Sequence, residues 1–149
     1  MRLLRLPIVT GLALFLAIGV MASYRAYYPV SSVRIVVAEP TLRPGSGIQV
    51  DTVCSGRGPV TIRVDLVQGD RVETAAIDRV SSRGWPFWDI RVVKHSTYAV
   101  VSGALLQRLD AGPAIIRATV EGAPAWLRQP PAVVREVSAQ VQGARQGAR

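Results

Sequence analysis

The sequence predicts an all-β fold: an antiparallel sandwich of about seven strands, preceded by one N-terminal transmembrane or signal helix. Three observations predict it. An uncharged apolar run opens the chain, apolar and polar residues alternate over residues 31–141, and Gly, Pro, Ser and Asp separate the alternating segments. The length of 149 residues suits one compact domain with a short appendage rather than two full domains.

Residues 1–28 form the predicted signal-anchor or transmembrane segment. Arg2 and Arg5 precede 19 consecutive uncharged residues, from Leu6 to Tyr24. As a helix this run rises about 28 Å, which matches the hydrocarbon core of a bilayer at about 30 Å. Because the positive charges precede the run, the positive-inside rule predicts a single membrane pass with a cytoplasmic N-terminus and the rest of the chain on the extracytoplasmic side.

Two interpretations of this segment stay open. The stretch Val20-Met21-Ala22 permits cleavage of a signal peptide after Ala22, which leaves a secreted or periplasmic domain. The apolar run is long for a signal peptide, however, and Tyr24, Tyr27 and Tyr28 follow it, as in the aromatic belt of a membrane interface. The uncleaved anchor is the preferred interpretation, and the cleaved signal is the alternative.

Residues 29–141 form the predicted sandwich, and residues 142–149 a disordered tail. In Val60–Leu66 every second residue is apolar, so one face of this strand is predicted to point into the core. The same parity places Cys54 on the core side of the preceding strand, as a small hydrophobe. The predicted strands are Ser31–Ala38, Ile48–Cys54, Val60–Leu66, Val72–Val80, Phe87–Val93, Tyr98–Ser102, Ala114–Val120 and Val133–Val141, with a breaker-rich loop at Glu39–Gly47, a hairpin turn at Gln68–Arg71 and a helical turn at Leu105–Leu109.

The stretch Leu109–Ala118, LDAGPAIIRA, is similar to the corner before the penultimate strand of bacterial immunoglobulin-like and fibronectin-like domains. That corner reads Leu, two residues, Gly, one residue, Tyr, and then alternating apolar residues. Leu109 and Gly112 match it, and Ala114 stands where those domains have the corner tyrosine. The resemblance covers residues 31–141, implies an immunoglobulin-like sandwich and transfers no functional residue.

Charge and cysteine content exclude several classes of protein. The net charge of +8 is moderate and spread along the chain, which does not indicate a nucleic-acid-binding surface. The single cysteine, Cys54, cannot close an intramolecular disulfide and has no second cysteine or nearby histidine for a structural zinc site. The sequence therefore predicts no metal site, no cofactor and no nucleic-acid partner.

Residues for catalysis are sparse. His95, the single histidine, lies in Lys94–Thr97 between two predicted strands and is interpreted as a solvated loop residue rather than a general base. Asp51 and Asp65 fall on predicted neighbouring strands with outward parity, and arginines nearby in sequence make them solvated surface charges rather than an acid/base pair. Nucleophile and phosphate-loop motifs are absent from the sequence. The sequence therefore predicts that the protein is not an enzyme.

Aromatic residues concentrate in Trp85-Pro86-Phe87-Trp88, which holds three of the nine in the chain. One interpretation is that these rings plug one end of the sandwich. The other is that Trp85, Phe87 and Trp88, together with Trp126, form an exposed partner-binding platform.

The predicted function is that of a non-enzymatic, membrane-tethered extracytoplasmic module that mediates protein interaction or assembly in the cell envelope. The motivating features are the anchor-like segment, the strand pattern and the missing catalytic motifs. The alternative is a glycan- or cell-wall-binding module, because tryptophan rings stack on the apolar faces of sugars.

Overall fold

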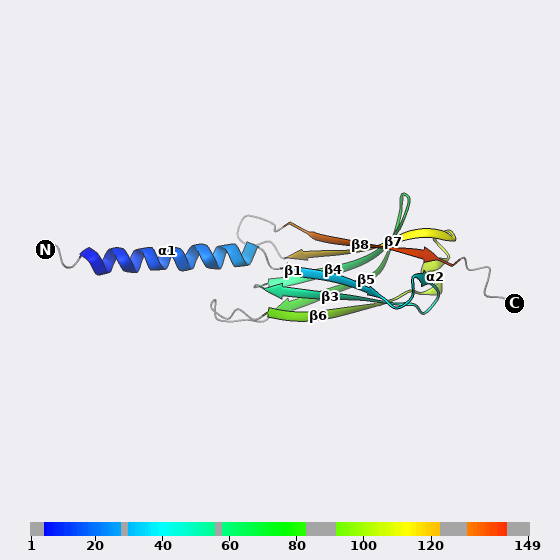
Figure 1. Cartoon of the computed structure of the whole chain (residues 1–149), viewed down its shortest axis with the longest axis horizontal. Helices are drawn as coiled ribbons and strands as arrows, with labels where there is room; N and C mark the ends of the chain where they lie inside the picture. Colours follow the sequence, from blue (N-terminus) through cyan, green and yellow to red (C-terminus); the bar gives the residue numbers. More distant parts are fainter. Residues whose placement is uncertain (1–4, 28–29, 56–57, 83–91, 123–130, 143–149) are drawn as a thin grey trace.

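The computed structural model describes residues 5–27, 30–55, 58–82, 92–122 and 131–142. An N-terminal helix, α1 (Arg5–Tyr27), leads into two β-sheets that face each other (Figure 1). The other elements are β1 (Val30–Val37), β2 (Thr41–Leu42), β3 (Gly47–Ser55), β4 (Gly58–Gln68), β5 (Arg71–Ser82), β6 (Val92–Val100), α2 (Gly103–Leu106), β7 (Gly112–Gly122) and β8 (Val133–Val141).

The sheets differ in width. One has three strands in the order β1-β3-β6, and the other has five in the order β2-β8-β7-β4-β5. All described pairs are antiparallel except the short β2–β8 pair, which is parallel. The eight strands in two sheets confirm the all-β sandwich that the sequence predicts.

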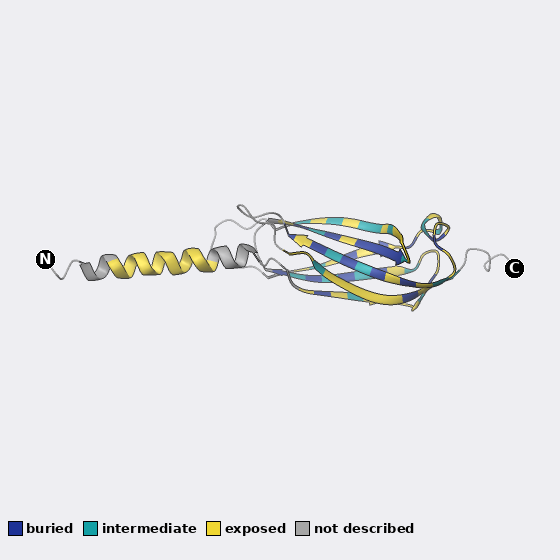
Figure 2. Cartoon of the chain, turned by 90° about the horizontal axis from the view of Figure 1, so that it is seen from above, coloured by how far each residue is buried: buried dark blue, intermediate teal, exposed yellow. Residues whose placement is uncertain are grey.

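The core lies between the sheets and is aliphatic. Most strands contribute buried residues to it at alternate positions, which appear as dark bands along the ribbons (Figure 2), whereas β5 contributes only partly buried residues. Ile62 and Leu66 of β4 and Ile116 of β7 are fully buried, and so are Ile48 and Val50 of β3 on the opposite sheet. The predicted alternation in residues 60–66 is therefore confirmed, because its apolar face is the one that packs against the other sheet.

Two short connections also match the sequence prediction. Gly69 and Asp70 join β4 to β5, and Gly69 has a φ of +58°, the left-handed conformation that tight hairpin turns require. At α2, the Ser102 hydroxyl accepts a hydrogen bond from the Leu105 N–H at 3.2 Å and caps the helix. The predicted hairpin turn is confirmed, and the predicted helical turn at Leu105–Leu109 is present but begins two residues earlier, as α2 at Gly103–Leu106.

The sequence places two loops where the structure has strands. The sequence predicts a break at Lys94–Thr97, whereas β6 runs without interruption because each residue from Val92 to Val100 pairs with β3. The polar residues at 94 and 96 are tolerated since they lie on the outer face of the sheet. In the predicted loop Glu39–Gly47, Thr41 and Leu42 form β2, and Leu42 is fully buried. The predicted strand residues 87–91 lie outside the described part of the chain, as does the predicted tail at residues 143–149.

The predicted N-terminal helix is present as α1, which extends away from the sheets (Figure 1). Its described side chains, at residues 9–21, are all exposed (Figure 2). Within the part of the chain that the structure describes, no helix combines the length and the apolar character that crossing a membrane requires. The helix is therefore confirmed, whereas the predicted membrane span is not found among the described residues.

Ile115 and Ile116 of β7 provide a matched test of the core. Ile116 is fully buried, whereas Ile115 points outward and is 37% exposed. We expect Ile116→Ala to lower the free energy of unfolding by about 2–5 kcal/mol, because it removes buried methyl groups and leaves a cavity. Ile115→Ala should cost about 1 kcal/mol or less. Urea unfolding followed by circular dichroism measures both, and equal losses would contradict the placement of the core.

Candidate functional site

The predicted aromatic platform lies outside the described residues. This applies to Trp85, Phe87, Trp88 and Trp126 alike. The described part of the chain instead brings together a polar cluster that the sequence analysis did not predict. The cluster consists of Asp78, His95 and Thr97 and joins the edge strands β5 and β6.

His95 and Thr97 lie on the core-facing side of β6, and Asp78 lies on β5 of the other sheet. His95 Nε2 is 2.9 Å from Asp78 Oδ2, and the Thr97 hydroxyl donates to the same oxygen at 3.1 Å. The Thr52 hydroxyl donates to the backbone carbonyl of His95 at 3.2 Å. The interpretation of His95 as a loop residue was therefore wrong, because β6 is continuous and turns this side chain toward the opposite sheet.

The electrostatics of the cluster favour an ionised Asp78. The hydrogen bond from His95 lowers the pKa of the Asp78 carboxyl below its ordinary value; partial burial opposes this, and the hydrogen bond from Thr97 adds to the lowering. A carboxylate that accepts two hydrogen bonds from the other sheet ties the two edge strands together. The cluster thus closes this flank of the sandwich.

The same geometry does not assemble a nucleophilic site. In a catalytic triad the histidine accepts a proton from a hydroxyl or thiol and is oriented by a carboxylate. Here the Thr97 hydroxyl donates to Asp78 instead, and among the described residues no hydroxyl or thiol is hydrogen-bonded to the His95 ring. Nor does any group of three or more His, Cys, Asp or Glu side chains in the described ranges have a metal-binding arrangement.

The sequence predicts that Asp51 and Asp65 lie on neighbouring strands. This is wrong, because β3 and β4 belong to different sheets. Asp51 is on the outer face of the three-stranded sheet, where hydrogen bonds from Ser96 at 2.7 Å and from Gln49 at 2.7 Å lower its pKa. Asp65 is buried on the outer face of the five-stranded sheet and accepts from Arg63 Nε at 2.8 Å. The prediction of a solvated surface charge is therefore wrong for Asp65, because its hydrogen bonds with Arg63 and Thr74 allow the carboxylate to be buried.

Cys54 faces the core, as predicted. Its burial raises the pKa of the thiol above the ordinary value, while a hydrogen bond with Thr52 partly offsets the rise. A neutral, buried thiol is a weak nucleophile and a poor metal ligand. The residue therefore acts as core packing.

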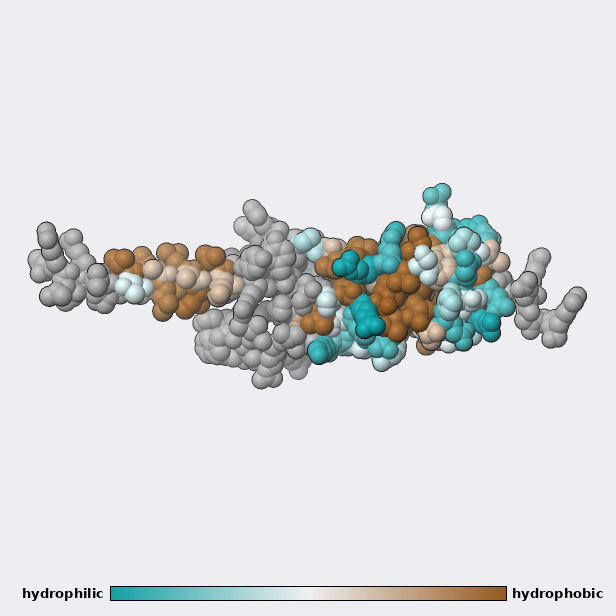
Figure 3. All heavy atoms as spheres, viewed as in Figure 1, coloured by the Kyte–Doolittle hydropathy of each residue, from teal (hydrophilic) through white to brown (hydrophobic). Residues whose placement is uncertain are grey.

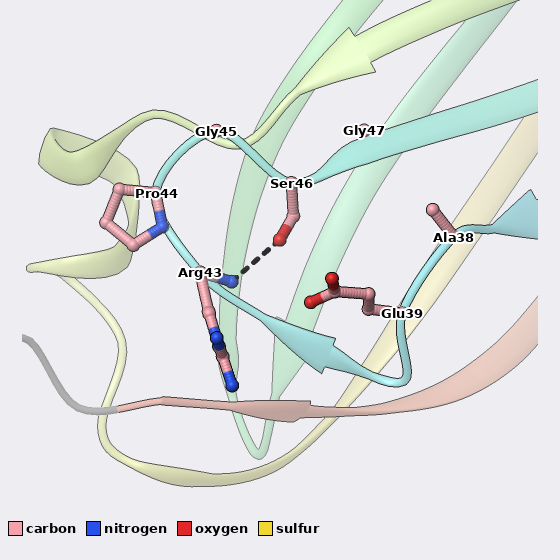
Figure 4. A pocket seen from close by; sticks show the side chains of 7 residues that line it. All are labelled: Ala38, Glu39, Arg43, Pro44, Gly45, Ser46 and Gly47. Carbon is pink, nitrogen blue, oxygen red and sulfur yellow. Dashed lines mark hydrogen bonds between the residues drawn. The ribbon is translucent and has the colours of Figure 1, made fainter.

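A shallow pocket of about 340 Å³ lies where the chain passes from β1 through β2 to β3 (Figure 4). The Arg43 N–H donates to the Ser46 hydroxyl at 2.8 Å, and the Ser46 N–H donates to the Arg43 carbonyl at 2.9 Å, which closes the turn. Glu39 points into the pocket, whereas the Arg43 guanidinium points away from it (Figure 4). The Ser46 hydroxyl in the same pocket accepts the Arg43 N–H and thereby helps to hold the turn.

The sequence matches no protein-family model and no curated protein.

The pKa of Asp78 yields a pH test of the inter-sheet cluster. Because the pKa is lowered in the folded state, the stabilisation is fully present above the unfolded value of about 3.9 and is lost as the pH falls through the lower folded value. We expect Asp78→Asn to reduce the free energy of unfolding by about 1 kcal/mol at pH 7, a modest loss because the pair is partly exposed. The difference from the parent protein should vanish at strongly acidic pH.

Urea unfolding at a series of pH values measures this difference. Asp70→Asn is the matched control, since Asp70 is an exposed residue of the β4–β5 turn. A constant deficit for Asp78→Asn at every pH would contradict the role of the carboxylate charge.

Proposed function

We propose that the protein is a non-enzymatic, membrane-tethered β-sandwich module that binds a protein partner in the cell envelope. In this proposal α1 holds the chain at the membrane, and the sandwich lies on the extracytoplasmic side. The observation that carries the proposal is an apolar helix whose described side chains, at residues 9–21, are all exposed, followed in the chain by a β-sandwich with a buried aliphatic core.

The described part of α1 supports the tether. At about 3.6 residues per turn, its exposed apolar side chains point in all directions around the helix axis. A helix that is apolar on every side is stable when other apolar groups surround it, as in a protein core or a lipid bilayer. Figure 3 shows the apolar surface of this helix beside the mixed surface of the sandwich. The exposed apolar residues are Val9, Leu12, Leu14, Phe15, Leu16, Ile18, Val20 and Met21.

The basic residues Arg2 and Arg5 support an N-terminus in the cytoplasm. The alternative, cleavage after Ala22, would release the sandwich as a secreted or periplasmic domain. The intact mass of the protein purified from membranes distinguishes the two, because a cleaved chain begins at Ser23.

We also infer an immunoglobulin-like arrangement of the strands. β1 belongs to the three-stranded sheet, and after residues 38–40 the chain continues as β2 at the rim of the five-stranded sheet, so both sheets share the first part of the chain. The penultimate strand, β7, is central in the wider sheet. It begins at the corner that carries the sequence resemblance, where Leu109 is buried and Gly112 has a φ of +143°.

The attachment points of the aromatic segments support a partner surface near the membrane. β5 ends at Ser82 and β6 begins at Val92, while β7 ends at Gly122. By register, all three residues lie at the end of the sandwich where β1 begins, which is the end nearest α1. The segments that contain Trp85, Phe87, Trp88 and Trp126 therefore start and finish at this end.

The tether is tested by placing a charge in α1. We expect the parent protein to stay with membranes after alkaline extraction and Phe15→Arg to be largely released, because an arginine at the centre of a membrane helix costs about 2.5–3.5 kcal/mol. Phe15→Leu is the apolar control. Equal retention of the parent and the arginine variant would contradict the tether.

The partner is tested by cross-linking the full-length protein in its native membrane and identifying the attached peptides by mass spectrometry. We expect a protein partner that Trp88→Ala loses and Trp88→Phe retains, since an aromatic ring would be the shared requirement. Capture of cell-wall glycan instead would favour the alternative function. Substrate turnover that disappears in His95→Ala would overturn the non-enzymatic proposal.

A further inference from the structure

The rim of the five-stranded sheet at β8 has an unpaired stretch. β2 pairs with β8 at only two positions, Thr41 with Gln140 and Leu42 with Val141. Among the described residues, no strand pairs with residues 133–139 on that side, although β7 pairs with them on the other side. Seven residues of a regular strand thus have no hydrogen-bonded strand partner on this side, while β1 of the other sheet lies beside part of β8.

Hydrogen bonds at β2 show which backbone groups face this edge. The N–H groups of Gln140 and Gln142 donate to the carbonyls of Pro40 and Leu42, at 2.8 Å and 3.1 Å. Backbone groups alternate sides along a strand, and the β7–β8 register has no irregularity. The N–H and C=O groups of residues 134, 136 and 138 therefore point to the open edge.

The other sheet edges are less regular or partly covered. The register of β5 shifts opposite Val64 and Asp65, which leaves an extra residue in β5, and such bulges discourage strand addition. Asp78 reaches from β5 to His95 and covers the flank between β5 and β6. β1 has a register irregularity at its start, between Val30 and Ser32. The β8 edge has neither a bulge nor a proline within the strand.

The side chains along this edge indicate what would bind there. Val134 is 45% exposed, and Val137 is 37% exposed although it faces the core side, because the narrower sheet does not cover this rim. Arg135 is exposed and makes no ion pair with a described residue, whereas Glu136 is held by Arg117 at 2.7 Å. Arg135 therefore gives this edge a positive charge that no described side chain neutralises.

A second copy could use all seven open residues only in the antiparallel register centred on Glu136, which would place the two Glu136 side chains opposite each other and is destabilising. Registers centred on Val137 avoid this conflict but shorten the pairing, because β2 already pairs with Gln140 and Val141. A strand with apolar residues beside Val134 and Val137 and a carboxylate beside Arg135 has no such conflict. We propose that residues 133–139 of β8 form a β-augmentation site for an extended protein segment that carries acidic residues. The proposal deepens the proposed function, on which it rests, by naming a site and the chemistry of the partner.

Ser138→Pro tests the backbone requirement. It removes one outward N–H while sparing the β7–β8 ladder, since the N–H of residue 138 points away from β7. The probe is a synthetic peptide of alternating valine and threonine with two glutamates, and its twin has lysines at those positions. We expect the full-length protein in detergent micelles to bind the glutamate peptide, with amide NMR shifts at Val134, Glu136 and Ser138. Ser138→Pro should weaken binding about tenfold, and Ser138→Thr should not.

Arg135→Glu tests the charge requirement. We expect this variant to prefer the lysine peptide, and Arg135→Lys to keep the parent preference. Absence of binding by both peptides, or equal binding by Ser138→Pro and Ser138→Thr, would overturn the site. Equal binding of the two peptides by the parent protein would overturn the acidic preference.

Sedimentation of the same proteins tests whether a second copy of the chain occupies the β8 edge. A parent dimer that Ser138→Pro converts to a monomer would make a second copy the occupant and overturn the acidic-segment proposal. Cross-links from a native partner that map elsewhere on the sandwich would leave the proposed function standing while removing this site.

Discussion

Burial of one aliphatic layer between two sheets is the interaction on which the rest of this structure depends. Ile48 and Val50 enter the layer from the narrow sheet, and Ile62, Leu66 and Ile116 enter it from the wide one. Removing such side chains from water is the main stabilising contribution in a domain of this size. Buried polar groups do not destabilise this layer, because among the described side chains no buried nitrogen or oxygen lacks a hydrogen-bond partner.

The unequal widths of the sheets determine which surfaces remain available. The five-stranded sheet is wider than the three-stranded one, and parts of its rims, at β5 and at residues 134–138 of β8, are not fully buried. At β5 the rim is closed by Asp78, which reaches His95 across the sheets. At β8 the rim is left with Arg135 and Val137 facing solvent. The core is thus buried between the sheets, while the edge of β8 remains available for strand addition.

The two ends of the sandwich differ in their connections. Away from α1, the Gln68 side chain donates to the Asp110 carbonyl at 2.8 Å and accepts from the Asp110 N–H at 2.8 Å, which ties the β4–β5 turn to the segment before β7. Arg71 adds an ion pair to Asp110 at 3.2 Å. At the end near α1, the β5–β6 and β7–β8 connections carry the aromatic residues. The polar ties hold the connections together at the end of the sandwich away from α1.

The sequence by itself determined the class of the fold and the facing of most strands, because alternation of apolar residues is a local property of the backbone. Cys54 and the alternating residues 60–66 lie on the predicted side for this reason. Sheet membership is not local, and only the tertiary structure decided it: Asp51 and Asp65 lie on different sheets because the chain crosses between them after β3. The contact between His95 and Asp78 depends on the return of the chain to the three-stranded sheet at β6 and on the packing distance between the two edge strands. Neither quantity is encoded in spacing along the chain, so the inter-sheet cluster and the open β8 edge could emerge only from the packed strands.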